Sequence, residues 1–164
     1  MNPPSQNDVR QKHRQLGNQT CSVSALEFVS KLYGITQLDS FPLQTNPANQ
    51  MKGFDEPNLQ SAVGLKGSAA FYDTQSALEL IEKETNAGKL PVISLRGFLI
   101  GLAPIPVNYH IYVAASEDGQ PILIDPADGQ VVATTKEDLA KVLEYNSHHN
   151  PERSTIHILV LERE

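Results

Sequence analysis

The spacing of apolar residues changes partway along this chain, and the change limits the folds open to it. Over residues 21–33 and 74–87 apolar side chains recur at helical spacing, which predicts two amphipathic helices. Beyond residue 89 they gather in short runs rich in β-branched residues, which predict strands. The runs lie at residues 90–95, 109–114, 121–124, 131–133 and 156–161. Helices first and an antiparallel sheet afterwards, with one late helix over residues 135–143, is the order of an α+β fold.

Composition supports one globular domain. The 164 residues are 40% hydrophobic and 20% charged, which is enough apolar material for a core. We predict a flexible N-terminal arm over the polar, proline-bearing residues 1–9 and a single domain over residues 10–164. The formal net charge of -6 opposes binding to nucleic acid or to anionic membranes, so we expect neither as a partner.

Cys21 is the only cysteine in the sequence, so the fold contains no intramolecular disulfide and no zinc site built from several thiolates. We expect no cofactor and no metal. The first fifteen residues lack the apolar core of a signal peptide, and no apolar stretch reaches the length of a membrane span. We therefore expect a cytoplasmic protein, or one exported by a route without a cleaved signal peptide.

Cys21 lies where the first amphipathic helix is predicted to start. Backbone N–H groups and the helix dipole at that point stabilise a thiolate, so we expect a cysteine pKa below the ordinary value of about 8.5. The alternative is a small buried hydrophobe with no chemical role. A nucleophilic cysteine needs a base from elsewhere in the chain, and the predicted strands provide a candidate.

His110 and Asp125 form that candidate. Alternation over residues 109–114 places His110 on one face of a strand. The sequence EDGQ at residues 117–120 predicts a hairpin turn that folds Asp125 back beside His110. A carboxylate in that position fixes the tautomer and orientation of an imidazole. The alternatives are a hydrogen-bonded sheet histidine and an aspartate that starts a turn before proline.

Three short motifs resemble those of papain-like cysteine peptidases. They are QLGNQTC over residues 15–21, YHIYV over residues 109–113, and IDP over residues 124–126 with Gly129. The last two look like the bacterial leader-peptidase branch that trims bacteriocin precursors. The resemblance implies a papain-like fold, in which an N-terminal helix carries Cys21 and packs against a C-terminal antiparallel sheet with His110 and Asp125.

The same resemblance implies a role for Gln15, because in that superfamily a glutamine six residues before the cysteine completes the oxyanion hole. Its amide and the backbone N–H of Cys21 would donate to the oxygen that becomes negative in the transition state. Gln19 is a rival for this role, although it stands only two residues before the cysteine. The chain departs from papain in having no tryptophan and in having Asp125 where papain has an asparagine.

These residues predict a cysteine hydrolase that attacks an amide bond through a triad of Cys21, His110 and Asp125. A peptidase and a protein glutamine deamidase share this chemistry up to the leaving group, and the superfamily resemblance extends to bacterial effectors that deamidate host proteins. We expect a protein or peptide substrate in either case. Two alternatives stay open: an acyltransferase or transglutaminase-like effector, and a papain-like module that binds without catalysis.

The remaining candidates are expected to be structural or exposed. His13 belongs to a basic run typical of a solvated surface. His148 and His149 have no further ligand at a partner spacing, and His157 alternates within the last strand. The apolar residues 98–107 are expected to form a loop that narrows the cleft from the side of the sheet.

Overall fold

The computed structural model of the chain describes residues 5–17, 20–100, 103–148 and 155–164. The helices are α1 (Gln6–Lys12), α2 (Cys21–Leu32), α3 (Pro57–Ala62), α4 (Thr74–Asn86) and α5 (Lys136–His148), with a 3-10 turn at Pro47–Asn49. The strands are β1 (Leu65–Tyr72), β2 (Leu90–Ile100), β3 (Ala103–Glu117), β4 (Gln120–Ile124), β5 (Val131–Ala133) and β6 (Ile156–Arg163).

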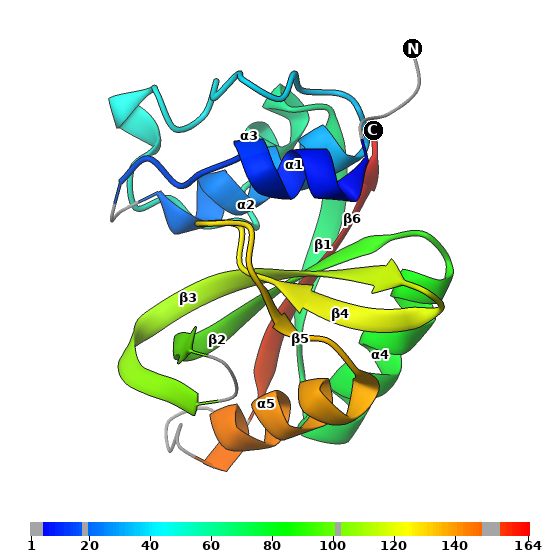
Figure 1. Cartoon of the computed structure of the whole chain (residues 1–164). Coiled ribbons are helices and arrows are strands. Elements are labelled where there is room, and N and C mark those ends of the chain that lie inside the picture. The colour runs from blue at the N-terminus through cyan, green and yellow to red at the C-terminus, as the bar shows by residue number, and fades with distance from the viewer. Residues whose placement is uncertain (1–4, 18–19, 101–102, 149–154) are drawn as a thin grey trace.

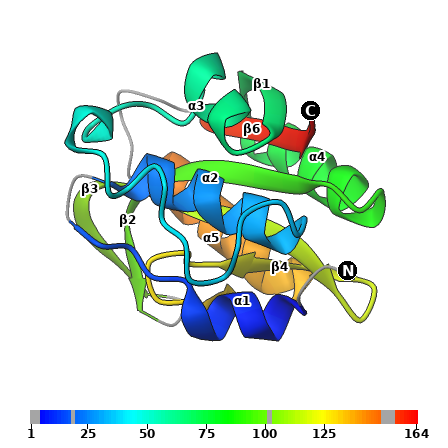
Figure 2. The same cartoon turned by 90° about the horizontal axis from the view of Figure 1, so that it is seen from above.

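A six-stranded sheet forms the middle layer, with helices on both of its faces (Figure 1). The strand order is β1-β6-β2-β3-β4-β5, and every neighbouring pair is antiparallel. Helices α1, α2 and α3 lie on one side of the sheet, and α4 and α5 lie on the other (Figures 1 and 2). The predicted α+β class is confirmed, as is the placement of Cys21 in an N-terminal helix that packs against an antiparallel sheet.

Each face of the sheet has its own core, because alternate residues of a strand point to opposite sides. In β3, Ile111 and Val113 belong to the core that includes α2, and Tyr112 and Ala114 belong to the core that includes α4 and α5. We call these the first core and the second core. Cys21 packs against the first core, whereas His110 lies on the strand face of Tyr112, which belongs to the second core.

The β3–β4 hairpin forms where the sequence predicts it. Asp118 and Gly119 both have positive φ, at 51° and 79°, as a two-residue turn of this kind needs. The resulting register pairs Val113 with Ile124, so the residue after β4 is Asp125 and lies beside β3. After α2, Gly34 has a φ of 74°, which is typical of a helix stop.

Two expectations about local structure are wrong. Residues 1–9 are predicted to be an arm, but α1 begins at Gln6 and the side chain of Val9 is buried in the first core. A helix of seven residues with a single apolar anchor has no periodicity for a sequence pattern to reveal.

Residues 98–107 are predicted to be a loop, but the described part of this range lies in two paired strands, since β2 runs to Ile100 and β3 starts at Ala103. Pro104 pairs there with Leu99. In the described residues, β4 pairs with β3 only from Val113 onwards. The first half of β3 is therefore an edge strand on that side, and proline is tolerated in edge strands because it has no N–H to donate.

No helix within the described ranges is both long enough and apolar enough to cross a membrane.

Candidate active site

His110 and Asp125 form a buried pair. The Nε2 atom of His110 lies 2.8 Å from Oδ1 of Asp125, and the two residues are only 2% and 8% exposed. An ionised carboxylate can only accept hydrogen bonds, so in the neutral imidazole this contact assigns the hydrogen to Nε2 and makes Nδ1 the basic nitrogen. The ring edge of His110 also contacts the ring of Tyr112 at a centroid distance of 4.9 Å. The imidazole is therefore held in one orientation, with Nδ1 as the basic atom.

The turn after β4 holds Asp125 in place. Its Oδ1 accepts a second hydrogen bond from the backbone N–H of Ala127, at 2.9 Å. Its backbone N–H donates to the carbonyl of Gln130, and its own carbonyl accepts from the N–H of Gly129, both at 2.8 Å. We call residues 125–130 the Asp125 turn. These bonds fix the carboxylate before any substrate binds, which is what an orienting group needs.

Cys21 is the first residue of α2 and is half-buried, with its side chain against the first core. Burial raises the pKa of its thiol, and the nearby charge of Asp125 raises it further. Hydrogen bonds from Ser22 and from the backbone at the helix start act in the opposite direction. The expectation of a lowered pKa is therefore wrong, because burial of the sulfur outweighs the N–H groups of the helix terminus. This environment favours the thiol over the thiolate.

Gln15 lies against the Asp125 turn. Its backbone N–H donates to the carbonyl of Ala127 at 3.0 Å, and its side-chain Nε2 donates one hydrogen to the carbonyl of Gly17 at 2.6 Å. Its Oε1 atom is buried and has no hydrogen-bond partner among the described residues. A buried acceptor without a hydrogen-bond partner is uncommon and destabilises the folded state. The folded chain therefore carries a destabilising group at the side-chain oxygen of Gln15.

Helix α1 and the Asp125 turn interlock. Arg10 donates from Nε to the carbonyl of Gly129 at 2.8 Å. A Cβ atom added to Gly129 would lie 1.9 Å from the carbonyl oxygen of Arg10, so only glycine allows this approach. The connection between β4 and β5 reaches up to the layer of α1 and α2 (Figures 1 and 2). Gln15 is thus bonded to the Asp125 turn through Ala127, Asp125 is bonded to His110, and the charge of Asp125 acts on Cys21.

A buried polar network lies along α2, and no sequence pattern predicted it. Its side chains are those of His13, Ser24, Glu27, Lys31 and Gln44. Glu27 and Lys31 stand four residues apart on a helix whose other positions are largely apolar, and that contrast is the only sequence signal of their burial. His13 is buried rather than solvated, and its pKa is lowered to about 3 by burial and by the charge of Lys31.

Lys31 occupies an unusual position for a lysine. Its Nζ lies 2.9 Å from Nδ1 of His13 and 3.7 Å from the centre of the Phe41 ring. Burial lowers its pKa to about 8, against the raising influence of Glu27 and Asp39. Because His13 is neutral, its Nδ1 can accept a hydrogen bond from the ammonium group, and the network is satisfied without placing two positive charges together.

The other predicted candidates lie away from this site or outside the described residues. His157 stacks on Phe71 at a centroid distance of 4.4 Å, which agrees with a structural role. Gln19 and His149 fall outside the described residues, as do the side chains of His148 and of residues 98–107. Over the described ranges, no three side chains of the metal-binding types His, Cys, Asp and Glu come together.

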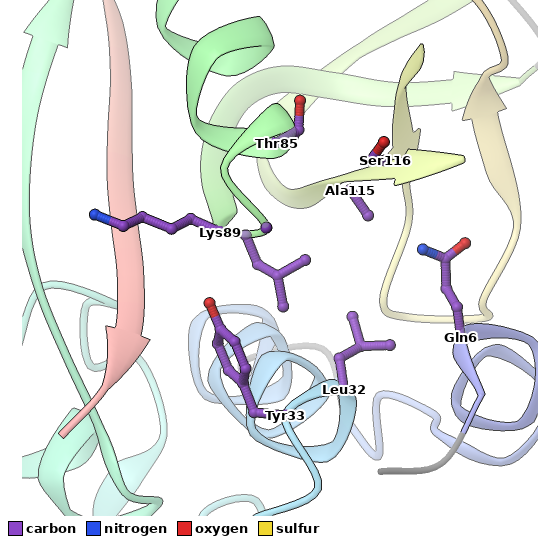
Figure 3. A pocket seen from close by; sticks show the side chains of 9 residues that line it. Gln6, Leu32, Tyr33, Thr85, Lys89, Ala115 and Ser116 are labelled. Atoms are coloured by element: carbon purple, nitrogen blue, oxygen red, sulfur yellow. The ribbon is translucent and has the colours of Figure 1, made fainter. Parts of the chain in front are cut away.

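A pocket open to solvent lies at the end of α2 away from Cys21. It has a volume of about 280 Å³ and is lined by Leu32 and Tyr33 from the end of α2, together with Lys89 and Ser116 (Figure 3). Cys21 and Leu32 are the two ends of α2, roughly 16 Å apart at the usual rise per residue. This cavity is therefore distinct from the His110–Asp125 pair.

Comparisons with known proteins identify no family for this chain. No family model matches the sequence, and no curated protein matches it. Among solved structures, the Pseudomonas avirulence protein AvrPphB matches with a TM-score of 0.49 and 13% sequence identity, over 96% of this chain and 100% of that one. The likeness is one of chain path, and the roles of the site residues rest on this chain alone.

Proposed function

We propose that this chain is a papain-like cysteine hydrolase that attacks an amide bond of a protein or peptide, with Cys21 as nucleophile, His110 as base and Asp125 as the residue that orients the base. The observation that carries the proposal is the buried 2.8 Å pair of His110 and Asp125. A histidine held by a carboxylate through one nitrogen presents the other nitrogen as a base of fixed direction. The turn that holds this pair also docks the segment that leads to Cys21.

The reaction starts from a neutral thiol, because the pKa of Cys21 is raised. Nδ1 of His110 takes the thiol proton as the sulfur attacks the carbonyl carbon. This proton transfer needs Nδ1 and the Cys21 sulfur within about 4 Å of each other. The new C–S bond forms and the carbonyl electron pair moves to oxygen. The backbone N–H of Cys21 and Nε2 of Gln15 donate to that oxygen, and Nε2 has a second hydrogen besides the one given to Gly17.

Collapse of the tetrahedral intermediate breaks the C–N bond. His110 returns its proton to the departing nitrogen, which leaves as an amine or as ammonia, and a thioester remains on Cys21. A water molecule, deprotonated by His110, then attacks the thioester and releases a carboxylic acid together with the free thiol. Cleavage of a peptide bond and deamidation of a glutamine side chain differ only in the group that leaves first.

Mass spectrometry of substrates tests this proposal. Unfolded casein and a panel of folded proteins are incubated with the wild-type chain and with Cys21→Ala. We expect Cys21-dependent conversion of amide to acid, seen as fragments if a peptide bond is cut and as an intact chain with the deamidation mass shift if a side chain is hydrolysed. An unchanged set of masses for every substrate would instead support a binding module without catalysis.

Two aspartates of one turn provide a matched comparison. Asp125→Ala removes the carboxylate from His110, and we expect the rate to fall by a factor of about 100 or more. Asp128→Ala makes the same change three residues away, where the lost interaction is a turn hydrogen bond from the N–H of Gln130 at 3.0 Å. We expect Asp128→Ala to keep most of the activity. Equal losses in the two variants would mean that Asp125 acts only on the shape of the turn.

A further inference from the structure

Gln44 lies in the long connection between α2 and α3 and is 8% exposed. Its side-chain oxygen accepts hydrogen bonds from the backbone N–H of Leu16 at 2.7 Å and from the hydroxyl of Thr20 at 3.1 Å. Its side-chain nitrogen donates to the carbonyl of Arg14 at 3.1 Å and to Oε1 of Glu27 at 2.8 Å. An amide has two N–H donors and two acceptor lone pairs, so every hydrogen-bonding position of Gln44 is in use.

Glu27 fixes which way the amide of Gln44 points. The carboxylate of Glu27 accepts from the backbone N–H groups of Leu43 and Gln44 through Oε2, at 2.8 and 3.4 Å, and from the Gln44 amide through Oε1. An ionised carboxylate can only accept hydrogen bonds. The amide nitrogen must therefore face Glu27, and the amide oxygen must face Leu16 and Thr20.

The contacts of Gln44 lie on both sides of Gln15. Arg14 and Leu16 are the residues before and after Gln15 in the sequence, and Thr20 is the residue directly before Cys21. The Thr20 hydroxyl stands at the cap position of α2 but does not cap the helix; its single hydrogen is shared between the carbonyl of Gly17 and Oε1 of Gln44. A single buried amide thus sets the backbone path next to Gln15 and next to Cys21.

We propose that Gln44, oriented by Glu27, is the positioning residue for the oxyanion-binding donors of this enzyme. The inference rests on the proposed function, in which those donors are the Gln15 amide and the Cys21 backbone N–H. Gln44 touches no reacting atom. It holds the two donors at a fixed spacing, and donors of that kind stabilise a transition state only when their geometry is set in advance.

A reaction that forms an oxyanion can be separated from one that does not. With p-nitrophenyl acetate, the Cys21 sulfur attacks the ester carbonyl, the C–S bond forms through a tetrahedral oxyanion, and the C–O bond breaks to release p-nitrophenolate. With iodoacetamide, the sulfur displaces iodide from a saturated carbon, and no oxyanion forms. Because Cys21 is the only cysteine, both rates report on it once the background of Cys21→Ala is subtracted.

Gln44→Met and Gln60→Met make the same change in two buried glutamines. Gln60 is 2% exposed, and its amide also bridges two backbone groups, the carbonyl of Phe54 and the N–H of Gly67. We expect Gln44→Met to slow acylation by p-nitrophenyl acetate about tenfold or more, while alkylation by iodoacetamide changes by less than about twofold. We expect Gln60→Met to leave both rates close to those of the wild type.

The outcomes separate the inference from the proposed function. If the wild type is acylated through Cys21 and Gln44→Met behaves as Gln60→Met does, the inference is wrong and the proposed function stands. If Cys21 of the wild type is acylated no faster than a free thiol of the same pKa, the proposed function fails and the inference fails with it. If circular dichroism shows that Gln44→Met does not fold, Thr20→Val replaces it, because this variant removes one hydrogen bond of Gln44. We expect Thr20→Val to slow acylation by a smaller factor and to leave alkylation unchanged. An unchanged acylation rate would contradict the inference.

Discussion

At the scale of single residues, the thiol of Cys21 is governed by two opposed influences. The start of α2 supplies N–H groups that favour a thiolate, and burial against the first core favours the neutral thiol. Burial is the larger of the two. In the proposed mechanism, the reactivity of this cysteine therefore depends on a base that removes its proton during the attack, and much less on a thiolate that exists beforehand.

The raised pKa of Cys21 predicts slow alkylation at low pH. A raised pKa leaves less thiolate at any pH below it, and only the thiolate reacts with iodoacetamide. We expect the native chain to be labelled more slowly at pH 6 to 7 than the same chain unfolded in urea, with the native rate rising about tenfold per pH unit in this range. The measurement is the mass of labelled protein against time. Faster labelling of the native chain at pH 6 would point to a thiolate–imidazolium pair.

At the scale of elements, α1 and the Asp125 turn act as one unit. The approach of Arg10 to Gly129 is too close for any side chain at position 129, and Gln15 pairs with the same turn. Helix α1 is short and lies far from β4 in the sequence, so this docking couples the segment before Cys21 to the residues that hold His110. A substitution at the contact between Arg10 and Gly129 should therefore displace both the segment before Cys21 and the residues that hold His110.

Two glycines with the same backbone conformation test this coupling. Gly129 and Gly119 have φ values of 80° and 79°, so alanine is strained by about 1–2 kcal/mol at either position. At Gly119 a Cβ meets nothing within 4 Å, whereas at Gly129 it meets the carbonyl oxygen of Arg10. We expect Gly129→Ala to lower the free energy of unfolding more than Gly119→Ala does, and to reduce Cys21-dependent activity as well. Equal urea midpoints and equal activities would show that α1 adjusts freely.

The elements also show what a sequence pattern can and cannot reveal. Helix α2 and the β3–β4 hairpin follow from apolar spacing and from the residues of one turn, and the meeting of His110 with Asp125 follows from that hairpin. These features depend on residues close together in the chain. Helix α1 is held by one buried valine and by a distant glycine, and no local pattern carries that information.

The buried network is beyond a sequence pattern for a different reason. Glu27 and Lys31 are charged residues on a helix, and charged residues are mostly exposed. Their burial becomes favourable only because the connection from α2 to α3 folds back and supplies Gln44 and the backbone N–H of Leu43. The expectation of a lowered pKa for Cys21 is wrong for the same reason. Burial of the sulfur depends on how many side chains surround it, and that number is a property of the tertiary fold.

At the scale of the whole molecule, stability should fall in acid because of His13. Its pKa is about 3 in the folded chain and about 6.5 when exposed. Between these values the unfolded chain binds a proton that the folded chain does not, so the free energy of unfolding decreases as pH falls, by up to about 1.4 kcal/mol per pH unit. Lys31, Arg14 and Ser24 are the polar groups that act on His13.

A difference measurement isolates this contribution. Urea unfolding of the wild type and of His13→Asn is followed from pH 7 to pH 4, and we expect the difference in free energy of unfolding between them to shrink as pH falls. His157→Asn serves as the control, because His157 lies on the far strand β6, and it should keep the pH dependence that His13 causes. A constant difference between wild type and His13→Asn would mean that His13 takes up its proton in the folded chain.

The position of β6 has a consequence for biosynthesis. This strand follows every other element in the sequence, yet in the sheet it lies between β1 and β2. A ribosome that has already made the first five strands therefore holds two separate pieces, β1 on one side and β2 to β5 on the other, each with an open edge prone to wrong pairing. Leu159 of β6 completes the first core and Ile158 completes the second. Neither core is complete, and the sheet is not continuous, until β6 has been made and pairs with both β1 and β2.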